Sequence, residues 1–234
     1  MADNKLDIRV YPIDEPKGNT KAFASVAVDD LIAIRGVRVV EGEKGLFVSM
    51  PQSQDKKSGE YHDTAFPLNG DLRKEITKAV IDEYETTINL DPGQRGYDKP
   101  EAGATNGIDI SGIKLDVRVY PLNEAQGKTK AFASISVDDL IAIRGVRVVE
   151  GEKGLFVTMP QSQDKDKKFH DVAFPLVGDL RKEITKTVLE EYKAAEKTAD
   201  KSLANGLKKG AEKAAENTAA PKEAAAKKSP GIGD

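Results

Sequence analysis

The sequence predicts an α+β fold made of two tandem domains, each an antiparallel β-sheet with a C-terminal α-helix, which together form a pseudo-dimer. Residues 28–48 recur without a change at 137–157, and the similarity extends from Leu6–Tyr84 to Leu115–Tyr192. A repeat of about eighty residues is longer than a stacking solenoid unit and can bury a modest core of its own. In each repeat alternating apolar residues come first and a helical pattern comes last, as in α+β domains.

The strands follow from period-two alternation and from β-branched residues. Gly36 interrupts the third strand and predicts a bulge. Glycines at both ends of residues 42–45 predict a tight hairpin, and a polar loop is expected over residues 51–60. Pro67 makes the fifth strand an edge strand, because proline cannot donate to a ladder. The strands predicted in the first repeat are residues 7–13, 21–28, 31–40, 46–50 and 61–68.

A helix is predicted after the strands. Leu72, Ile76 and Val80 recur at four-residue spacing and define one apolar face, which continues to Tyr84. Asp71 is the predicted N-cap, because its carboxylate can accept the unpaired amides of the first turn. The second repeat has the same pattern from residue 179 to 192.

The repeat boundaries and the composition divide the chain into four segments. Residues 1–86 and 114–193 are the two repeats, and residues 87–113 form a linker that contains glycines and prolines. As a flexible coil this linker spans roughly 29 Å, enough for the two copies to meet. Residues 194–234 are rich in Ala, Lys and Glu and almost lack large apolar residues, so we predict disorder or a transient helix.

The composition excludes several classes of protein. There is no Cys, so neither disulfides nor thiolate chemistry are available. No apolar run approaches the length of a membrane span, and the first residues lack the pattern of a signal peptide. A cytoplasmic protein without a membrane partner is therefore expected.

The net charge of −3 is distributed unevenly along the chain. It is −4 over residues 1–86, −2 over 87–113, +1 over 114–193 and +2 over 194–234. A protein whose whole surface binds polyanions would be strongly basic. Nucleic-acid binding would therefore depend on a local patch.

Residues that could carry catalysis or bind a metal are few. His62 and His170 occupy the same position in the two copies and are each followed by Asp, but adjacent strand residues face opposite ways. Two neighbouring carboxylates in a turn, such as Asp29 and Asp30, are more often solvated than metal-bound. We expect no enzymatic activity, no cofactor and no metal.

Basic residues are the strongest candidates for a function. Arg35 and Arg38 would lie on one face of their strand if Gly36 forms a bulge. Arg73 and Lys74 occupy the first helical turn, where cations oppose the helix dipole and a bound phosphate would explain them. They could equally be solubilising charges partnered by acidic neighbours. The candidate nucleic-acid-binding residues are Arg35, Arg38, Lys56, Lys57, Arg73 and Lys74, with Arg144, Arg147, Lys165, Lys167, Lys168, Arg181 and Lys182 in the second repeat.

Three motifs resemble the SpoVG family (stage V sporulation protein G, a septation regulator). They are VRVVEGEKGLFVSMP, then YHDTAFPLNGD, then a helix that ends near Glu-Tyr, and each recurs with a few substitutions in the second repeat. The resemblance implies a pair of domains that binds DNA or RNA and regulates septation, sporulation and other genes. It also implies binding by the cations at the helix starts and by the lysines after Met-Pro. This sequence departs from the family pattern because residues 52–55, QSQD, stand where basic residues are usual.

Two functions follow from these observations. The first is a tandem regulator that binds DNA or RNA through basic residues near the helix N-termini. The alternative is a structural or protein-binding pseudo-dimer that recruits a partner through exposed strand edges. In both, the two repeats pair within one chain, and a further homodimer is possible.

Overall fold

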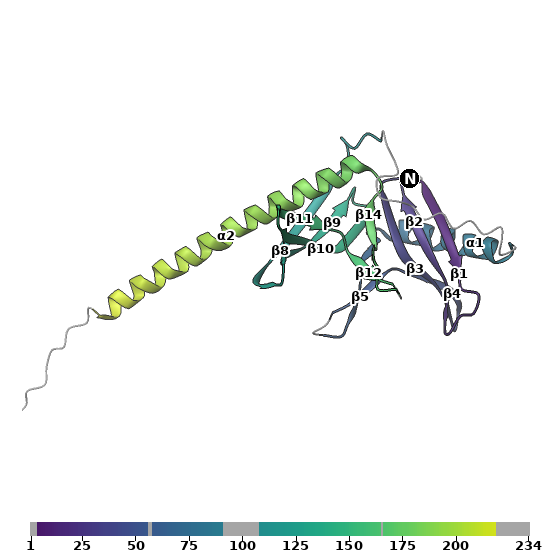
Figure 1. The fold of residues 1–234 in the computed structure, drawn as a ribbon, viewed down its shortest axis with the longest axis horizontal. Helices are drawn as coiled ribbons and strands as arrows, with labels where there is room; N and C mark the ends of the chain where they lie inside the picture. Colours follow the sequence, from purple (N-terminus) through teal and green to yellow (C-terminus); the bar gives the residue numbers. More distant parts are fainter. Residues whose placement is uncertain (1–3, 56–57, 91–107, 165, 219–234) are drawn as a thin grey trace, which may run out of the picture. The chain divides into compact units, whose positions relative to one another are not determined.

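Each repeat begins with an antiparallel meander in the computed structural model, which describes residues 4–55, 58–90, 108–164 and 166–218 (Figure 1). In the first repeat the meander is β1 (Leu6–Pro12), β2 (Thr20–Val28), β3 (Ile32–Gly42) and β4 (Gly45–Ser49). In the second it is β8 (Leu115–Gln126), β9 (Thr129–Val137), β10 (Ile141–Gly151) and β11 (Gly154–Thr158). These four-strand meanders match the sequence prediction.

Three short strands and a helix follow each meander. They are β5 (Gln52–Gln54), β6 (Tyr61–Asp63), β7 (Ala65–Pro67) and α1 (Gly70–Ile88) in the first repeat. The second repeat has β12 (Gln161–Gln163), β13 (Phe169–Asp171), β14 (Ala173–Pro175) and α2 (Gly178–Thr218). The α+β prediction, with a helix at the end of each repeat, is confirmed.

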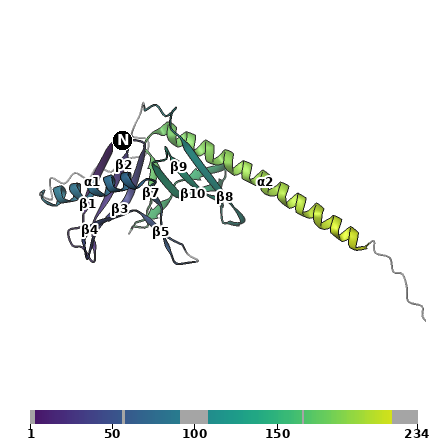
Figure 2. The same cartoon turned by 180° about the vertical axis from the view of Figure 1, so that it is seen from behind.

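The helix covers one face of the meander and the core lies between them. Figure 2 shows α1 lying across the strands of the first sheet. Leu72, Ile76 and Val80 on α1 are each at most 1% exposed, and they pack in one cluster with Ala22 and Ala24 of β2. Leu180, Ile184, Val188 and Tyr192 of α2 belong to the same buried cluster. The apolar helix face predicted from four-residue spacing is therefore the buried face.

The two repeats exchange strands. Strand β14 of the second repeat pairs with β3 of the first, with Ala173–Pro175 opposite Ile32–Ile34. Reciprocally, β7 of the first repeat pairs with β10 of the second, with Ala65–Pro67 opposite Ile141–Ile143. Each sheet thus gains one strand from the other copy, and both repeats lie in one compact unit, Met1–Ala195. The two halves of the chain therefore contact each other through these exchanged strands.

One strand prediction and one loop prediction need correction. The single strand predicted over residues 61–68 was wrong, because the segment divides at Thr64 into β6 and β7. The expected edge position holds for β7, which carries Pro67 and has β10 as its partner in the described sheet. The Thr64 amide donates to the Pro51 carbonyl at 2.7 Å, which separates the two parts. Strand β6 pairs with β5, inside the segment predicted as a polar loop, while β7 joins the other repeat.

The helix boundaries also differ from the prediction. Asn69, and not Asp71, is the N-cap of α1: its side-chain oxygen accepts the Leu72 amide at 2.6 Å, and α1 begins at Gly70. Helix α1 ends at Ile88, two residues inside the predicted linker. Helix α2 continues to Thr218, through a segment predicted as disorder or transient helix, and its alanine-rich composition accounts for the continuation. The rest of the predicted tail and residues 91–107 of the linker lie outside the described residues.

Within the described ranges, no helix has both the length and the apolar character needed to cross a bilayer.

Candidate nucleic-acid interface

A bulge at Gly36 sets the geometry of the site. Ser25 lies opposite Arg35 and Ala24 lies opposite Val37, so Gly36 is an extra residue in β3. Its φ of +75° is a left-handed conformation that glycine adopts without strain. Because the bulge shifts the side-chain alternation by one residue, Arg35 and Arg38 both lie on the outer face of the sheet, as predicted.

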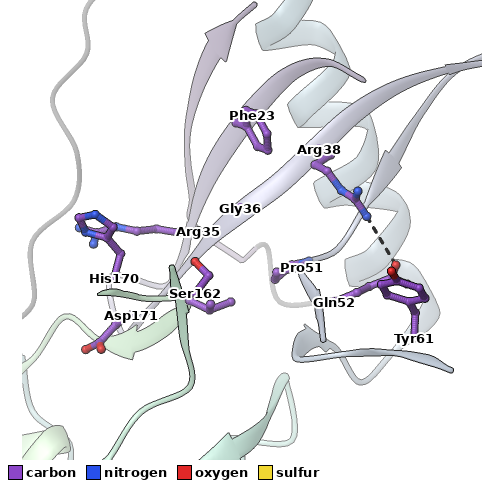
Figure 3. Close-up of a pocket in the computed structure, with 11 residues that line it drawn as sticks. Phe23, Arg35, Gly36, Arg38, Pro51, Gln52, Tyr61, Ser162, His170 and Asp171 are labelled. Atoms are coloured by element: carbon purple, nitrogen blue, oxygen red, sulfur yellow. Dashed lines mark hydrogen bonds between the residues drawn. The ribbon is translucent and has the colours of Figure 1, made fainter. Parts of the chain in front are cut away.

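Both arginines line a groove of 480 Å³ (Figure 3). Phe23, directly opposite Arg38 in the ladder, and Tyr61 on β6 add exposed aromatic rings, at 46% and 64% exposure. The remaining lining includes residues of the second repeat on β12 and β13, among them Ser162 and His170. The groove therefore combines cations and aromatic rings, and both repeats contribute to it.

A polar chain connects the groove to the start of α1. Arg38 Nη2 donates to Gln52 Oε1 at 3.5 Å, and Gln52 Nε2 donates to Asp63 Oδ1 at 2.9 Å. The other oxygen of Asp63 accepts Arg73 Nη2 at 3.3 Å. The strand arginine and the helix-start arginine, which the sequence indicated separately, are thus held around one Gln–Asp pair.

The second repeat has the same chain of contacts. Arg147 Nη2 donates to Gln161 Oε1 at 3.5 Å, and Gln161 Nε2 donates to Asp171 Oδ1 at 2.9 Å. Arg181 lies 3.9 Å from the other oxygen of Asp171. The arrangement is therefore a property of the repeated unit. Its acidic member balances one cation, so the local excess of positive charge is small.

Arg35 and its counterpart Arg144 contact the exchanged strands. The guanidinium carbon of Arg35 lies 4.5 Å from the ring centroid of Phe174 on β14, and that of Arg144 lies 4.7 Å from the ring of Phe66 on β7. Such cation–π contacts hold the exchanged strands against the sheet. The Arg35 amide also donates to the Val172 carbonyl at 2.7 Å. Arg35 thus stabilises the pairing of the repeats as well as lining the groove.

The predicted lysines are more dispersed. Lys74 and Lys182 form exposed ion pairs with Asp71 and Asp179, so the partner predicted for Lys74 is present. Lys167 and Lys168 are exposed in the loop between β12 and β13. The other three predicted lysines, Lys56, Lys57 and Lys165, lie outside the described residues.

The histidines differ between the copies. His170 Nε2 lies 2.6 Å from Asp164, whereas His62 lies 3.8 Å from Glu60. The hydrogen bond to His170, together with the Lys168 amide, holds the pKa of Asp164 below its usual value. Among the described residues no three His, Asp or Glu side chains gather as a metal-binding group.

Sequence reasoning missed the residues that complete the site. Phe23 lies between the buried Ala22 and Ala24, so strand alternation alone places its ring on the outer face beside Arg38 and could have identified it. Gln52 and Asp63 could not be linked to Arg38 because their contacts depend on the β5–β6 pairing. The recurrence of QSQD in both copies was the one sequence feature that could have pointed to Gln52.

Together, the fold and the site define a fused pair of small α+β domains with exchanged strands and arginines on the outer faces of the sheets. The SpoVG family model matches residues 4–86 and 113–194, more than half of the chain. The chain therefore belongs to the SpoVG family and carries two copies of its domain.

Curated relatives correspond to a single repeat. A septation protein SpoVG of Clostridium perfringens is 40% identical over 88 residues, which are 96% of that protein and 38% of this chain. One from Myxococcus xanthus is 39% identical over 86 residues, 84% of its length and 37% of this chain. One from Anaeromyxobacter sp. (strain K) is 43% identical over 77 residues, 74% of its length and 33% of this chain. By name these relatives are septation proteins.

Proposed function

We propose that this two-copy SpoVG protein binds nucleic acid through the arginines of β3, β10 and the two helix starts, and that it regulates septation, sporulation and gene expression in the bacterial cytoplasm. The observation that carries the proposal is the convergence of Arg38 and Arg73 on one Gln–Asp pair, repeated by Arg147 and Arg181. Guanidinium groups held beside an open groove are suited to phosphate oxygens. The small excess of positive charge predicts modest affinity that falls as salt rises.

Fluorescence anisotropy with labelled DNA and RNA at low salt tests this proposal. The double variant Arg38→Gln/Arg147→Gln removes one cation from each site, and we expect weaker binding to all sequences. The slope of log affinity against log salt should decrease by about 0.7–0.9 for each lost phosphate contact. Lys78→Gln/Lys186→Gln is the matched control, because it removes the same charge from exposed helix positions that pair with Asp82 and Glu183.

Equal loss in both variants would show that only net charge matters and would contradict a defined site. Absence of binding by wild-type protein to any nucleic acid at low salt would refute the proposal.

A protein-binding role is the second candidate. Among the described strands, β4 and β11 each pair with one neighbour, and they expose Phe47 and Phe156 at 48% and 45%. An extended peptide could add to such an edge. A partner that remains bound after nuclease treatment, and is lost when β4 carries a proline, would support this candidate.

A further inference from the structure

The groove contains features that phosphate binding alone does not require. Phe23 lies on the outer face of β2 at 46% exposure, and Tyr61 on β6 is 64% exposed. Their counterparts in the second repeat, Phe132 and Phe169, are 36% and 64% exposed. At these two positions each copy therefore exposes an aromatic ring, although the residue at one of them differs between the copies. Exposed rings beside cations are typical of surfaces on which nucleic-acid bases stack.

The position of Phe23 relative to Arg38 supports a direct role. The two residues are opposite each other on β2 and β3, and Phe132 is likewise opposite Arg147. Side chains in such cross-strand pairs start about 5 Å apart. A base stacked on Phe23 would therefore place its own phosphate, or the next one, within reach of the Arg38 guanidinium.

The other walls supply polar groups for the edges of a base. Gln52 lies between Arg38 and Tyr61, and Ser162 and His170 approach from the second repeat (Figure 3). Amide, hydroxyl and imidazole groups can donate to and accept from a base. The one carboxylate of the lining, Asp171, hydrogen-bonds to Gln161, and Figure 3 shows it pointing away from Arg35 and Arg38. Among the described residues that line the groove, no carboxylate therefore faces the two arginines.

The size of the groove and the aromatic rings favour a single strand over a duplex. A volume of 480 Å³ lies within the range of small-ligand pockets, roughly 300–1,000 Å³, and so suits one or two nucleotides. In a duplex the faces of the bases are covered by their neighbours, whereas an unpaired base can leave the stack and lie on a ring.

We infer that the groove binds single-stranded nucleic acid, with a base stacked on Phe23 or Tyr61 and the adjoining phosphates on Arg38 and Arg35. The related residues of the second repeat, Phe132, Phe169, Arg147 and Arg144, would bind a second stretch in the same way. This inference rests on the proposed function, because it identifies the form of nucleic acid that the arginines bind.

The test uses the full chain and 12-nucleotide probes of one sequence, as single-stranded RNA, single-stranded DNA and duplex DNA. Phe23→Leu/Phe132→Leu keeps an apolar side chain but removes the ring, and we expect single-strand affinity to fall roughly 5- to 100-fold. The salt slope should stay unchanged, since no phosphate contact is lost. Phe23→Tyr/Phe132→Tyr should retain binding. Phe47→Leu/Phe156→Leu is the matched control, because these phenylalanines are equally exposed on β4 and β11.

A second measurement reports stacking directly. The chain contains no Trp, so Phe23→Trp introduces a single indole into the groove. Single-stranded probes should quench its fluorescence in a saturable manner, and an indole introduced by Phe47→Trp should not respond.

The outcomes separate the inference from the proposed function. Two results would overturn stacking and leave nucleic-acid binding intact. The first is that duplex DNA binds as tightly as the single strands. The second is that the Leu variants bind like wild type while Arg38→Gln/Arg147→Gln binds more weakly. No binding by any probe would refute both. Tighter binding of RNA or of DNA would support the inference in either case and identify the preferred strand.

Discussion

The ring of Phe174 is buried where β14 joins the sheet of the other repeat, and its removal gives a sharp prediction. Phe174 is 1% exposed on β14, whereas Phe66, its counterpart on β7, is only partly buried. Truncating a buried Phe to Ala costs about 3–5 kcal/mol through lost burial and a residual cavity. The contact with Arg35 adds about 0.5–2 kcal/mol. We expect Phe174→Ala to lose at least about 3 kcal/mol, a large part of a domain's usual 5–15 kcal/mol.

Urea unfolding followed by far-UV circular dichroism measures this loss as a change in midpoint at constant slope. Phe66→Ala should cost less by about 1 kcal/mol or more, because more of its ring is already solvated. Phe47→Ala, at 48% exposure, is the surface control and should cost under about 1 kcal/mol. Equal losses at Phe174 and Phe66 would refute the reasoning from burial. Two separate transitions for the two repeats would refute the reasoning that each sheet is completed by the other copy.

Three further predictions concern the cap, the pairing and the histidine contact. Asn69→Ala should destabilise the protein by about 1 kcal/mol in the same urea assay, because Asn69 caps α1. Asp71→Ala should destabilise it clearly less. A larger loss of stability in Asp71→Ala than in Asn69→Ala would identify Asp71 as the cap. By light scattering after size exclusion, the full chain should have the mass of one 25.3 kDa chain, since the exchange is satisfied internally. Residues 114–234 alone should form a homodimer, and a stable monomer of that fragment would argue against obligatory exchange. In NMR titrations, His170→Gln should raise the pKa of Asp164 toward 3.8, because the hydrogen bond to His170 is the main cause of its depression. A depressed carboxyl pKa stabilises the folded protein above about pH 3.8, and this stabilisation is lost as the pH falls through the pKa of Asp164 in the folded state. His170→Gln should therefore reduce this stabilisation. An unchanged Asp164 pKa in the variant would show that the contact is absent in solution.

Local patterns were enough to predict the meanders, the bulge and the buried helix faces. They could not predict which sheet receives the short strand before each helix. Strands β3 and β10 have the same sequence, IAIRGVRVVEG, so β7 finds equivalent partners in its own repeat and in the other. The choice depends on the path of the chain between the repeats and on packing around Phe66 and Phe174. Local sequence contains neither.

The candidate site was predictable to a similar extent. Arg35 and Arg38 follow from alternation and one glycine, and their common face was predicted correctly. The Gln52–Asp63 link depends on two three-residue strands that no periodicity reveals. The second copy also shows why an N-cap is hard to assign from one sequence. Val177, buried at 3%, stands where the first copy has Asn69, so the two helices begin by different means.

Joining the two copies in one polypeptide removes a constraint that binds every symmetric homodimer, in which each mutation necessarily appears twice. Here the bulged strands are identical, yet one copy places Tyr61 where the other has Phe169, and the loop at residues 55–60 is one residue longer than its counterpart. Because residues of both copies line the groove, a substitution in one copy alters the groove residues of the other copy as well as its own. The two copies are therefore free to become unequal, so that a nucleic-acid strand bound as proposed would meet them in a preferred direction.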